Sequence, residues 1–250
     1  MNASFLYLIF FLVEELLINK IREEPLVSII VPLYNEEDTI GDVLERLERL
    51  ATIRKEIIVV DDGSRDNSLT ASKQFPFVTI LNHKERRGKG AAIQTGFAHG
   101  KGDIFVVQDA DLEYSPEEIP KIVHPIIERK ADVVYGSRFK EIRAEDMKFS
   151  HRLGNRILSI ASTLLYGKLV TDVMTGHKCF RRNVIEALHL SENGFKIEVE
   201  ITAQVLRRDF RFTEVPITYH YRKHSHSKIR SSDGLECLWK LLKARFQCNS

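Results

Sequence analysis

The sequence contains little cysteine, little net charge and no long hydrophobic run. Only 3 of its 250 residues are cysteine. Cys179, Cys237 and Cys248 lie too far apart in the chain to suggest a metal-binding pair or a disulfide framework. The formal net charge of +2 is too small to indicate nucleic-acid binding. We therefore expect a protein of a reducing, cytoplasmic compartment, with no nucleic acid among its partners.

The first residues are apolar but too few to span a bilayer. Residues 5–13 are strongly apolar, and Glu14 and Glu15 follow them directly, whereas a membrane-spanning helix needs about 20 apolar residues. Neither the basic start nor the cleavage site of a secretory signal is visible. We expect residues 1–24 to form an apolar or amphipathic helix, which either packs on protein or lies at a membrane interface.

Residues 233–250 predict a second amphipathic helix. Its apolar stripe and the basic residues beside it are Leu235, Leu238, Trp239, Leu242 and Phe246, and Lys240, Lys243 and Arg245. The stripe either faces the protein core or lies on an anionic membrane surface. No repeat or Pro/Gly-rich linker interrupts residues 25–232, which we expect to form one domain.

Buried-looking strands alternate with helical patterns over the first half of the chain. Apolar runs predict strands at 27–33, 56–60, 104–108 and 132–135, and helices are predicted at 36–50, 67–74, 88–99 and 116–129. Apolar runs without alternation are typical of strands covered on both faces. We therefore predict an α/β fold with a mostly parallel central sheet flanked by helices. Ligands of such sheets bind at the carboxyl ends of the strands.

Polar residues follow each predicted strand, and Asp109 and Asp111 are the most informative of them. They leave a buried strand with one residue between them, and carboxylates are hard oxygen ligands that suit Mg²⁺ or Mn²⁺. The alternative is a solvated turn, because Asp-x-Asp is common by chance. Three further strand ends are predicted at the same edge of the sheet, which favours a metal site.

Two other segments supply groups that a nucleotide needs. Asp61 and Asp62 follow a buried strand and can accept hydrogen bonds from a base or a ribose, whereas the polar residues after them equally suit a helix cap. Residues 83–92 place cations, among them Lys89, before a helix whose first amides can meet phosphate. The glycine spacing there matches neither a Walker loop nor a dinucleotide fingerprint.

In this order the motifs resemble glycosyltransferase family 2, and within it the polyprenyl-phosphate (dolichyl-phosphate) glucose and mannose synthases. They are Pro32-x-Tyr34-Asn35-Glu36, Asp61-Asp62-Gly63-Ser64-x-Asp66, Gly88-Lys89-Gly90, Asp109-Ala110-Asp111 and Gly136-Ser137-Arg138. Further matches at 171–180, 194–200 and 214–217 extend the resemblance over about residues 26–234. It implies a GT-A fold, which is Rossmann-like, an activated nucleotide sugar, a divalent metal and inversion at the anomeric carbon.

Carried over residue by residue, the resemblance assigns a donor site. It implies Mg²⁺ or Mn²⁺ as the cofactor and a UDP- or GDP-hexose as the donor. The implied nucleotide-sugar residues are Pro32, Tyr34, Glu36, Asp61, Asp62, Lys89, Asp109 and Ala110, and the implied metal ligands are Asp109, Asp111 and Glu113. Glu113 stands where relatives often have Gln.

The kind of acceptor decides which further residues the reaction needs. A polyprenyl phosphate is already an anion and needs cations to orient it instead of a general base. The candidates for this task are Arg138, Arg152, Arg222 and Lys228. A hydroxyl acceptor needs a base, and Asp172 is the candidate for that role. Asp111 and Arg138 are the other predicted catalytic residues.

Three functions stay open at this point. The first is a metal-dependent hexosyltransferase that acts on a polyprenyl phosphate and lies peripherally at the cytoplasmic face of a membrane. The second is a family 2 enzyme that extends a glycan or a cell-surface polysaccharide at a hydroxyl. The third is a non-catalytic nucleotide-sugar-binding module, which the intact pair of metal-binding acids disfavours.

Overall fold

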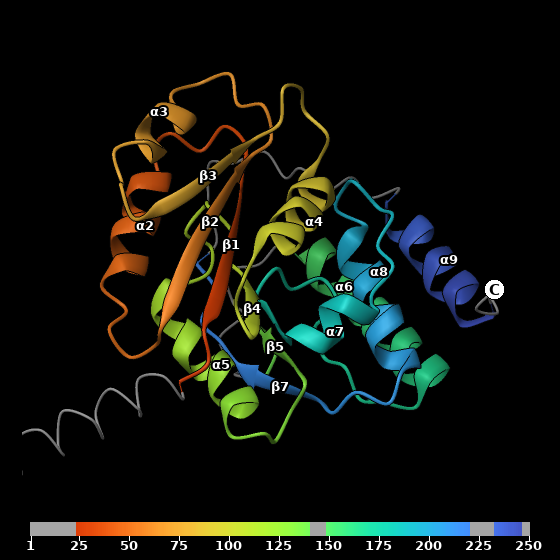
Figure 1. Ribbon diagram of the computed structural model, residues 1–250. Helices are drawn as coiled ribbons and strands as arrows, with labels where there is room; N and C mark the ends of the chain where they lie inside the picture. Colours follow the sequence, from red (N-terminus) through yellow and green to blue (C-terminus); the bar gives the residue numbers. More distant parts are fainter. Residues whose placement is uncertain (1–23, 141–148, 221–232, 247–250) are drawn as a thin grey trace, which may run out of the picture.

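A sheet of seven strands organises the part of the chain that the computed structural model describes, residues 24–140, 149–220 and 233–246 (Figure 1). The strands are β1 Val27–Leu33, β2 Lys55–Asp61, β3 Val78–Asn82, β4 Ile104–Val107, β5 Val133–Ser137, β6 Lys178–Arg181 and β7 Phe212–Pro216. The helices are α2 Ile40–Glu48, α3 Ser68–Ser72, α4 Lys89–His99, η1 Pro116–Glu118, α5 Ile119–Ile127, α6 Phe149–Tyr166, α7 Arg182–Ala187, α8 Ile197–Arg207 and α9 Asp233–Phe246. The helix predicted for residues 1–24 falls, except for Glu24, outside the described residues.

The order of the strands reverses at β1. They lie in the order β3-β2-β1-β4-β6-β5-β7, and every strand except β6 runs in the same direction. β1 pairs with β2 on one side and with β4 on the other, so the winding of the chain reverses there. Ligands of open α/β sheets bind outside the carboxyl ends at such a reversal. The predicted fold class, a mostly parallel sheet flanked by helices, is confirmed.

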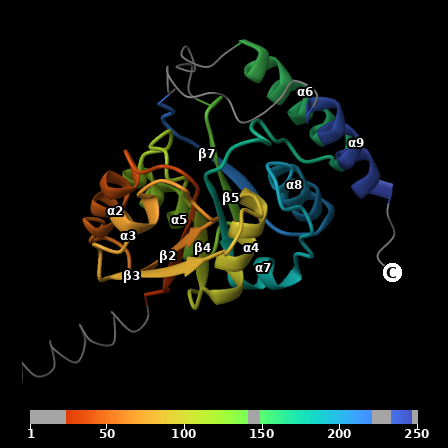
Figure 2. The same cartoon turned by 90° about the horizontal axis from the view of Figure 1, so that it is seen from above.

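Helices cover both faces of this sheet (Figure 2). One apolar cluster joins the sheet to α2 and α5 through residues such as Leu44 and Ile122, and a second joins it to α4, α7 and α8 through residues such as Ile93 and Ile201. The strands between these layers read as continuous apolar runs because both of their faces are buried. Each buried aliphatic side chain contributes about 1.5–3 kcal/mol of stability.

Two helices lie beyond α8, away from the sheet. A third apolar cluster, which includes Leu158, Val199 and Leu241, holds α6 and α9 against α8. The Tyr166 hydroxyl on α6 also donates to the carbonyl oxygen of Leu241 on α9 over 2.9 Å. Among the described helices, none is both long and apolar enough to cross a membrane.

The structure differs from the sequence prediction in its short elements. The apolar pattern does not predict β3, β6 or β7. β3 is an edge strand without a fully buried residue, and β6 and β7 carry Lys178 and Glu214, whose burial depends on partners elsewhere in the chain. α2 begins at Ile40 instead of residue 36, because the backbone amides of Glu36 and Glu37 bond to side chains near α3.

Candidate active site

The loops that follow β1 and β2 bond to each other at the carboxyl edge of the sheet. Leu33 is paired with Asp61 in the strand register. The amide of Asn35 donates to the Ser64 hydroxyl over 3.1 Å, and the amide of Arg65 donates to the Asn35 side chain over 2.8 Å. Asn35 has a φ of 52°, a left-handed conformation that asparagine tolerates better than most residues. The two loops therefore form one unit.

Asp61 and Asp62 are both buried, but they are used differently. The Asp62 carboxylate accepts the amides of residues 87 and 88 over 2.8 and 2.7 Å, and it lies 2.8 Å from Nδ1 of His83. It therefore shapes the loop that precedes α4. Asp61 accepts bonds of 3.3 Å from the amide of Ser64. Such long bonds leave Asp61 with acceptor capacity for a nucleoside.

The loop after β1 also contacts the loop after β4. The Thr39 hydroxyl donates to the carbonyl oxygen of Ala110 over 2.8 Å and lies 3.5 Å from the Glu36 carboxylate.

The guanidinium carbon of Arg86 lies 4.1 Å from the ring centroid of Tyr34. A planar cation on an aromatic ring, at a partly exposed position, provides a flat surface of the kind that a nucleobase stacks against.

The predicted nucleotide-sugar residues all lie near the carboxyl ends of β1, β2 and β4, in these strands or in the loops after them, or at the start of α4. They are Pro32, Tyr34, Glu36, Asp61, Asp62, Lys89, Asp109 and Ala110. The geometry gives Asp62 a part in organising a loop, which sequence reasoning did not anticipate. Direct contact of these residues with a nucleotide stays a prediction.

Lys89 is the cation of the acidic edge, which is the part of the sheet's carboxyl edge that carries Asp109, Asp111 and Glu113. Its Nζ lies 2.7 Å from one carboxylate oxygen of Asp109, 3.0 Å from the other, and 3.3 Å from Glu198 on α8. Lys178 bonds to the same Glu198 from the buried side. Burial opposes the charge on Lys89, but Asp109 and Glu198 outweigh it, so the pKa of the Lys89 ammonium is raised. Lys89 therefore stays positive beside the first acid of the pair.

Asp111 and Glu113 crowd negative charge into the same place. Burial, the nearby Asp109 carboxylate and Glu113 raise the pKa of Asp111 to about 7. Burial also raises the pKa of Glu113, against a hydrogen bond from the Tyr219 hydroxyl. The residue between them, Leu112, has a φ of 60°, a strained backbone conformation of the kind that clusters at functional sites. Crowded carboxylates of this kind are relieved by a bound cation.

The donor atoms of this edge fit a hard divalent cation. Asp109 and Asp111 offer carboxylate oxygens, which Mg²⁺ and Mn²⁺ prefer. Among the residues that the structure describes, no three His, Cys, Asp or Glu side chains converge closely enough to enclose a metal ion. The acids would thus supply part of a coordination shell, with phosphate oxygens and water in the rest, as is usual for Mg²⁺. The assignment of Asp109, Asp111 and Glu113 as ligands stays a prediction.

Arg138 and Asp172 form a buried ion pair near Glu113. Arg138 Nε and Nη2 each lie 2.7 Å from an oxygen of Asp172, and the Arg138 amide donates to the same carboxylate over 3.1 Å. Glu214 on β7 holds Asp172 in place, because it accepts the amides of Thr171 and Asp172 over 2.9 and 3.1 Å. Burial opposes the Arg138 charge, yet Asp172 prevails, and the pKa of the guanidinium is raised.

Aromatic rings surround the same guanidinium. The Arg138 guanidinium carbon lies 5.2 Å from the ring centroid of Tyr219 and 6.0 Å from that of Tyr114. The Tyr114 hydroxyl accepts the amide of Gly176 over 3.1 Å. These contacts fix the plane of Arg138, and its charge also acts on the nearby Glu113 carboxylate. Asp172 is occupied by Arg138, and this geometry disfavours its predicted role as a general base.

Of the other predicted acceptor residues, the structure describes Arg152. Arg152 is exposed on α6 and makes no ion pair with any residue that the structure describes. Arg222 and Lys228 lie outside the described residues. A role for these three residues stays a prediction.

Sequence reasoning missed several buried residues of the site. His177 is fully buried against Tyr114, and neither of its ring nitrogens has a hydrogen-bond partner among the described residues. Lys178 and Glu214 bind carboxylate and amide groups from distant segments. Their only sequence signal is their position within the segments 171–180 and 214–217 that carry the family resemblance.

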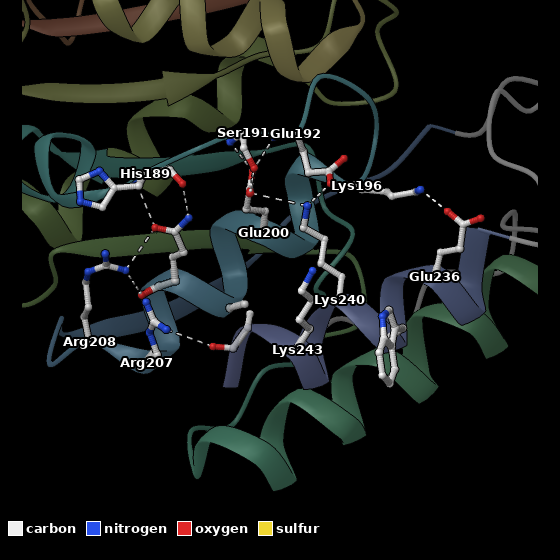
Figure 3. A pocket seen from close by; sticks show the side chains of 14 residues that line it. His189, Ser191, Glu192, Lys196, Glu200, Arg207, Arg208, Glu236, Lys240 and Lys243 are labelled. Atoms are coloured by element: carbon white, nitrogen blue, oxygen red, sulfur yellow. Dashed lines mark hydrogen bonds and ion pairs between the residues drawn. The ribbon is translucent and has the colours of Figure 1, made fainter. Parts of the chain in front are cut away.

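A separate cavity lies between α8 and α9 (Figure 3). It has a volume of about 770 Å³ and is lined largely by charged residues. Two of its lysines bond to acids, Lys196 to Glu236 and Lys240 to Glu192. Arg207, Arg208 and Lys243 also line it, so its lining contains more basic than acidic side chains.

Comparison with known sequences supports the resemblance. The model of glycosyl transferase family 2 matches residues 28–188. A dolichol-phosphate mannosyltransferase of Pyrococcus furiosus is 31% identical over 85% of this chain, which spans 61% of that protein's length. A UDP-N-acetylglucosamine–dolichyl-phosphate N-acetylglucosaminyltransferase of Methanococcus voltae is 30% identical over 82% of this chain and 90% of its own length. An undecaprenyl-phosphate 4-deoxy-4-formamido-L-arabinose transferase of Yersinia pestis is 35% identical over 81% of this chain and 62% of its own length.

Solved structures agree on the fold. Glucosyl-3-phosphoglycerate synthase from Mycobacterium tuberculosis in complex with UDP has a TM-score of 0.75 and 20% identity, over 92% of this chain and 84% of that one. The same enzyme with Mn²⁺, UDP and phosphoglyceric acid has a TM-score of 0.74 and 19% identity, over 92% of this chain and 82% of that one. The predicted GT-A fold is confirmed. From the family match and these relatives, the chain belongs to glycosyltransferase family 2.

Proposed function

We propose that the chain transfers a hexose from a UDP- or GDP-sugar to a polyprenyl phosphate, with inversion at the anomeric carbon and with Mg²⁺ or Mn²⁺ at Asp109 and Asp111. The observation that carries the proposal is the buried Arg138–Asp172 pair beside the acidic edge. It provides a fixed cation for an anionic acceptor while it occupies the carboxylate that a hydroxyl acceptor would need. An acceptor that is already an anion fits this arrangement.

The donor half binds and neutralises the leaving group. Asp61 has acceptor capacity for the nucleoside, and Lys89 at the start of α4 is placed to meet the diphosphate. When bound, the divalent metal would stabilise the negative charge that develops on the leaving diphosphate. Lys89 keeps its proton beside Asp109, so it contributes a second positive charge at the same edge.

The acceptor half orients a phosphate. The bidentate pair with Asp172 fixes the guanidinium plane of Arg138, and a fixed guanidinium suits phosphate geometry. The repulsion between the acceptor phosphate and the donor diphosphate has to be offset, and we propose Arg138 for that task, with Arg152, Arg222 and Lys228 as further candidates. The names of the three relatives, each of which transfers a sugar to a polyprenyl phosphate, support this acceptor class.

A polyprenyl acceptor also locates the reaction. We propose peripheral association with the cytoplasmic face of a membrane, where such a lipid and a cytoplasmic nucleotide sugar meet. The relatives named above differ in the sugar that their names print, so the transferred hexose is left to experiment.

A labelled-sugar assay tests the acceptor class. The full chain is incubated with a polyprenyl phosphate, Mg²⁺ or Mn²⁺ and a radiolabelled UDP- or GDP-hexose. We expect the label in the organic phase, as a phosphate ester that mild acid releases. Label found only in an acid-stable hydroxyl glycoside would contradict the proposal.

Thermal unfolding tests the donor independently of turnover. Free UDP and GDP are added with and without each metal, since a ligand that binds the folded state raises the Tm with its concentration over its Kd. We expect one nucleotide to raise the Tm, and more so with metal. An equal response to both nucleotides, unaffected by metal, would remove the donor assignment.

A further inference from the structure

Helix α6 buries Leu158 but exposes most of its other large aliphatic residues. Leu153, Ile157, Ile160 and Leu164 are 48%, 49%, 53% and 80% exposed, and their spacing of four, three and four residues places them on one stripe of the helix. The opposite side of α6 is buried and includes Asn155 and polar serines. A helix of a water-soluble surface has the reverse pattern.

Helix α9 lies beside α6 and also exposes large apolar residues. Trp239 and Phe246 are 68% and 77% exposed, and Trp239 also stands at the cavity between α8 and α9. Figure 2 shows α9 beside α6 at the end of the molecule beyond α8, and Nε of Arg245 donates to the carbonyl oxygen of Leu165 over 2.9 Å. The exposed apolar residues of these two neighbouring helices are here named the α6–α9 face: Leu153, Ile157, Ile160, Leu164, Trp239 and Phe246.

Positive charge accompanies the apolar residues. Residues 149–166 of α6 contain no Asp or Glu, and Arg152 and Arg156 are exposed next to Leu153 and Ile157. Lys243 and Arg245 are exposed on α9. An apolar stripe flanked by cations is complementary to an anionic bilayer, because the aliphatic groups enter the acyl region while the cations meet the lipid phosphates.

The inner side of α6 contacts the acceptor half of the site. Asn155 Nδ2 donates to the carbonyl oxygen of Thr171 over 3.3 Å, and the amide of Met174 donates to Asn155 Oδ1 over 3.0 Å. Asp172, which holds Arg138, lies between these two contacts in the chain. The inner side of α6 therefore packs against the segment that carries Asp172, and a helix with its side chains is about 10 Å across.

We propose that the α6–α9 face seats the protein on an anionic lipid bilayer. The inference deepens the proposed function and rests on it for the identity of the lipid acceptor. Seated in this way, α6 lies in the membrane interface, and a polyprenyl phosphate reaches Arg138 without leaving the bilayer. A second copy of the chain is a poorer occupant, because a two-fold contact through this face would oppose the arginines of one copy to those of the other.

The single tryptophan of the chain reports on this face directly. With vesicles of equimolar phosphatidylcholine and phosphatidylglycerol, Trp239 fluorescence is expected to shift to the blue and to be quenched by brominated acyl chains. Unchanged fluorescence in the presence of bound vesicles would place another surface on the membrane and overturn the proposal.

Exposed-position variants test the apolar stripe. The double variant Ile157→Ser with Leu164→Ser is expected to weaken co-sedimentation with these vesicles by about tenfold. The matched control is Ile127→Ser, an aliphatic residue that is 42% exposed on α5, which should bind like the parent. Arg156→Gln is expected to weaken binding about fivefold, and only when phosphatidylglycerol is present.

Three outcomes would contradict the proposal. They are equal vesicle binding by the double variant and the parent, loss of binding only when residues 1–23 are removed, and a parent dimer that the double variant dissociates. Transfer to a short, water-soluble polyprenyl phosphate separates this inference from the proposed function. If the protein binds vesicles but transfers no sugar to this acceptor, the proposed function is wrong and the membrane-binding face stands. If it transfers sugar but does not bind vesicles, the membrane-binding face is wrong and the proposed function stands.

Discussion

The donor and acceptor halves of the site are built in different ways. The donor half consists of loops that follow β1, β2 and β4, and its functional side chains lie within a few residues of a strand end. The acceptor half is assembled from Arg138, Asp172 and Glu214, whose hydrogen bonds span 34 and 42 residues of the chain. The loops of the donor half also bond to each other over 29 and 71 residues. The difference is that strand ends announce the polar residues of the donor half, whereas no strand pattern places Asp172 and Glu214 beside Arg138.

The donor and acceptor halves also differ in how their charges are balanced. In the donor half, burial and repulsion from neighbouring acids raise the pKa of Asp111 and of Glu113. In the acceptor half, the Arg138 charge is already matched by Asp172 over two bonds of 2.7 Å. The donor half therefore gains stability when a cation binds, whereas the acceptor half is preorganised before any ligand arrives.

The largest effect is expected at Asp111. We predict that Asp111→Asn lowers metal-dependent transfer by about a thousandfold, a loss of about 4 kcal/mol in transition-state stabilisation. The Tm without metal should stay the same or rise, because one of the crowded charges is removed. Asp42→Asn, at an exposed position on α2, is the control. Full activity of Asp111→Asn would end the metal assignment and the contrast with the acceptor half.

The second effect is expected at the buried pair. Asp172→Asn leaves the Arg138 guanidinium without its counter-charge, and breaking a buried pair destabilises a protein by about 3 kcal/mol. Urea unfolding should show this loss, and the acceptor KM should rise. If Asp172 acts as a general base, kcat would instead lose an ionisation from its pH profile, with little change in stability.

A third, smaller effect concerns acid sensitivity. Burial lowers the pKa of His177 from 6.5 to about 4, so the unfolded chain binds a proton that the folded chain rejects between these values. This contribution to stability is complete above pH 6.5 and is lost as the pH falls toward 4. Between pH 7 and 5 the loss is about 2 kcal/mol.

The matched variant for this prediction is His177→Phe, which keeps a ring against Tyr114. Metal-free protein is unfolded in urea at pH 7 and at pH 5, and the difference in unfolding free energy is compared between parent and variant. The variant should be less sensitive to pH. Equal sensitivity would mean that carboxylates, and not His177, determine the acid response.

The smallest effect is expected at Arg152. Because this arginine is exposed and lacks an ion pair within the described residues, Arg152→Gln should change the acceptor KM by less than about threefold. Steady-state kinetics with a short polyprenyl phosphate measure it, and Arg138→Gln is the comparison. An effect of Arg152 as large as that of Arg138 would show that the acceptor half extends onto α6.

Sequence reasoning succeeds where burial on both faces controls the pattern. The strands that end near Glu36, Asp61 and Asp109 are continuous apolar runs, and their polar ends are visible without a structure. β6 and β7 escape prediction because Lys178 and Glu214 interrupt the apolar pattern. These charges are tolerated only because Glu198 and the amides of residues 171–172 reach them from elsewhere in the chain.

The same limit applies to single residues of the site. Asp62 looks like a nucleotide ligand in the sequence, but in the structure its oxygens accept amides of the loop before α4. Asp172 is a candidate general base in the sequence, but in the structure it is the buried partner of Arg138. Residue type and strand position predict which chemistry is available, and they do not predict which partner takes it.

By itself, the sequence determined the α/β class that the structure confirms, and it predicted the edge of the sheet for the candidate site and the acids of a donor half. These features follow from side-chain period and from the direction of parallel strands, both of which are local. Only the tertiary structure decided that Arg138 is held by Asp172, that Lys89 lies between Asp109 and Glu198, and that α6 exposes most of its large aliphatic residues. Each of these depends on segments that meet only after the chain has packed, and hydrogen bonding and burial are properties of that packing.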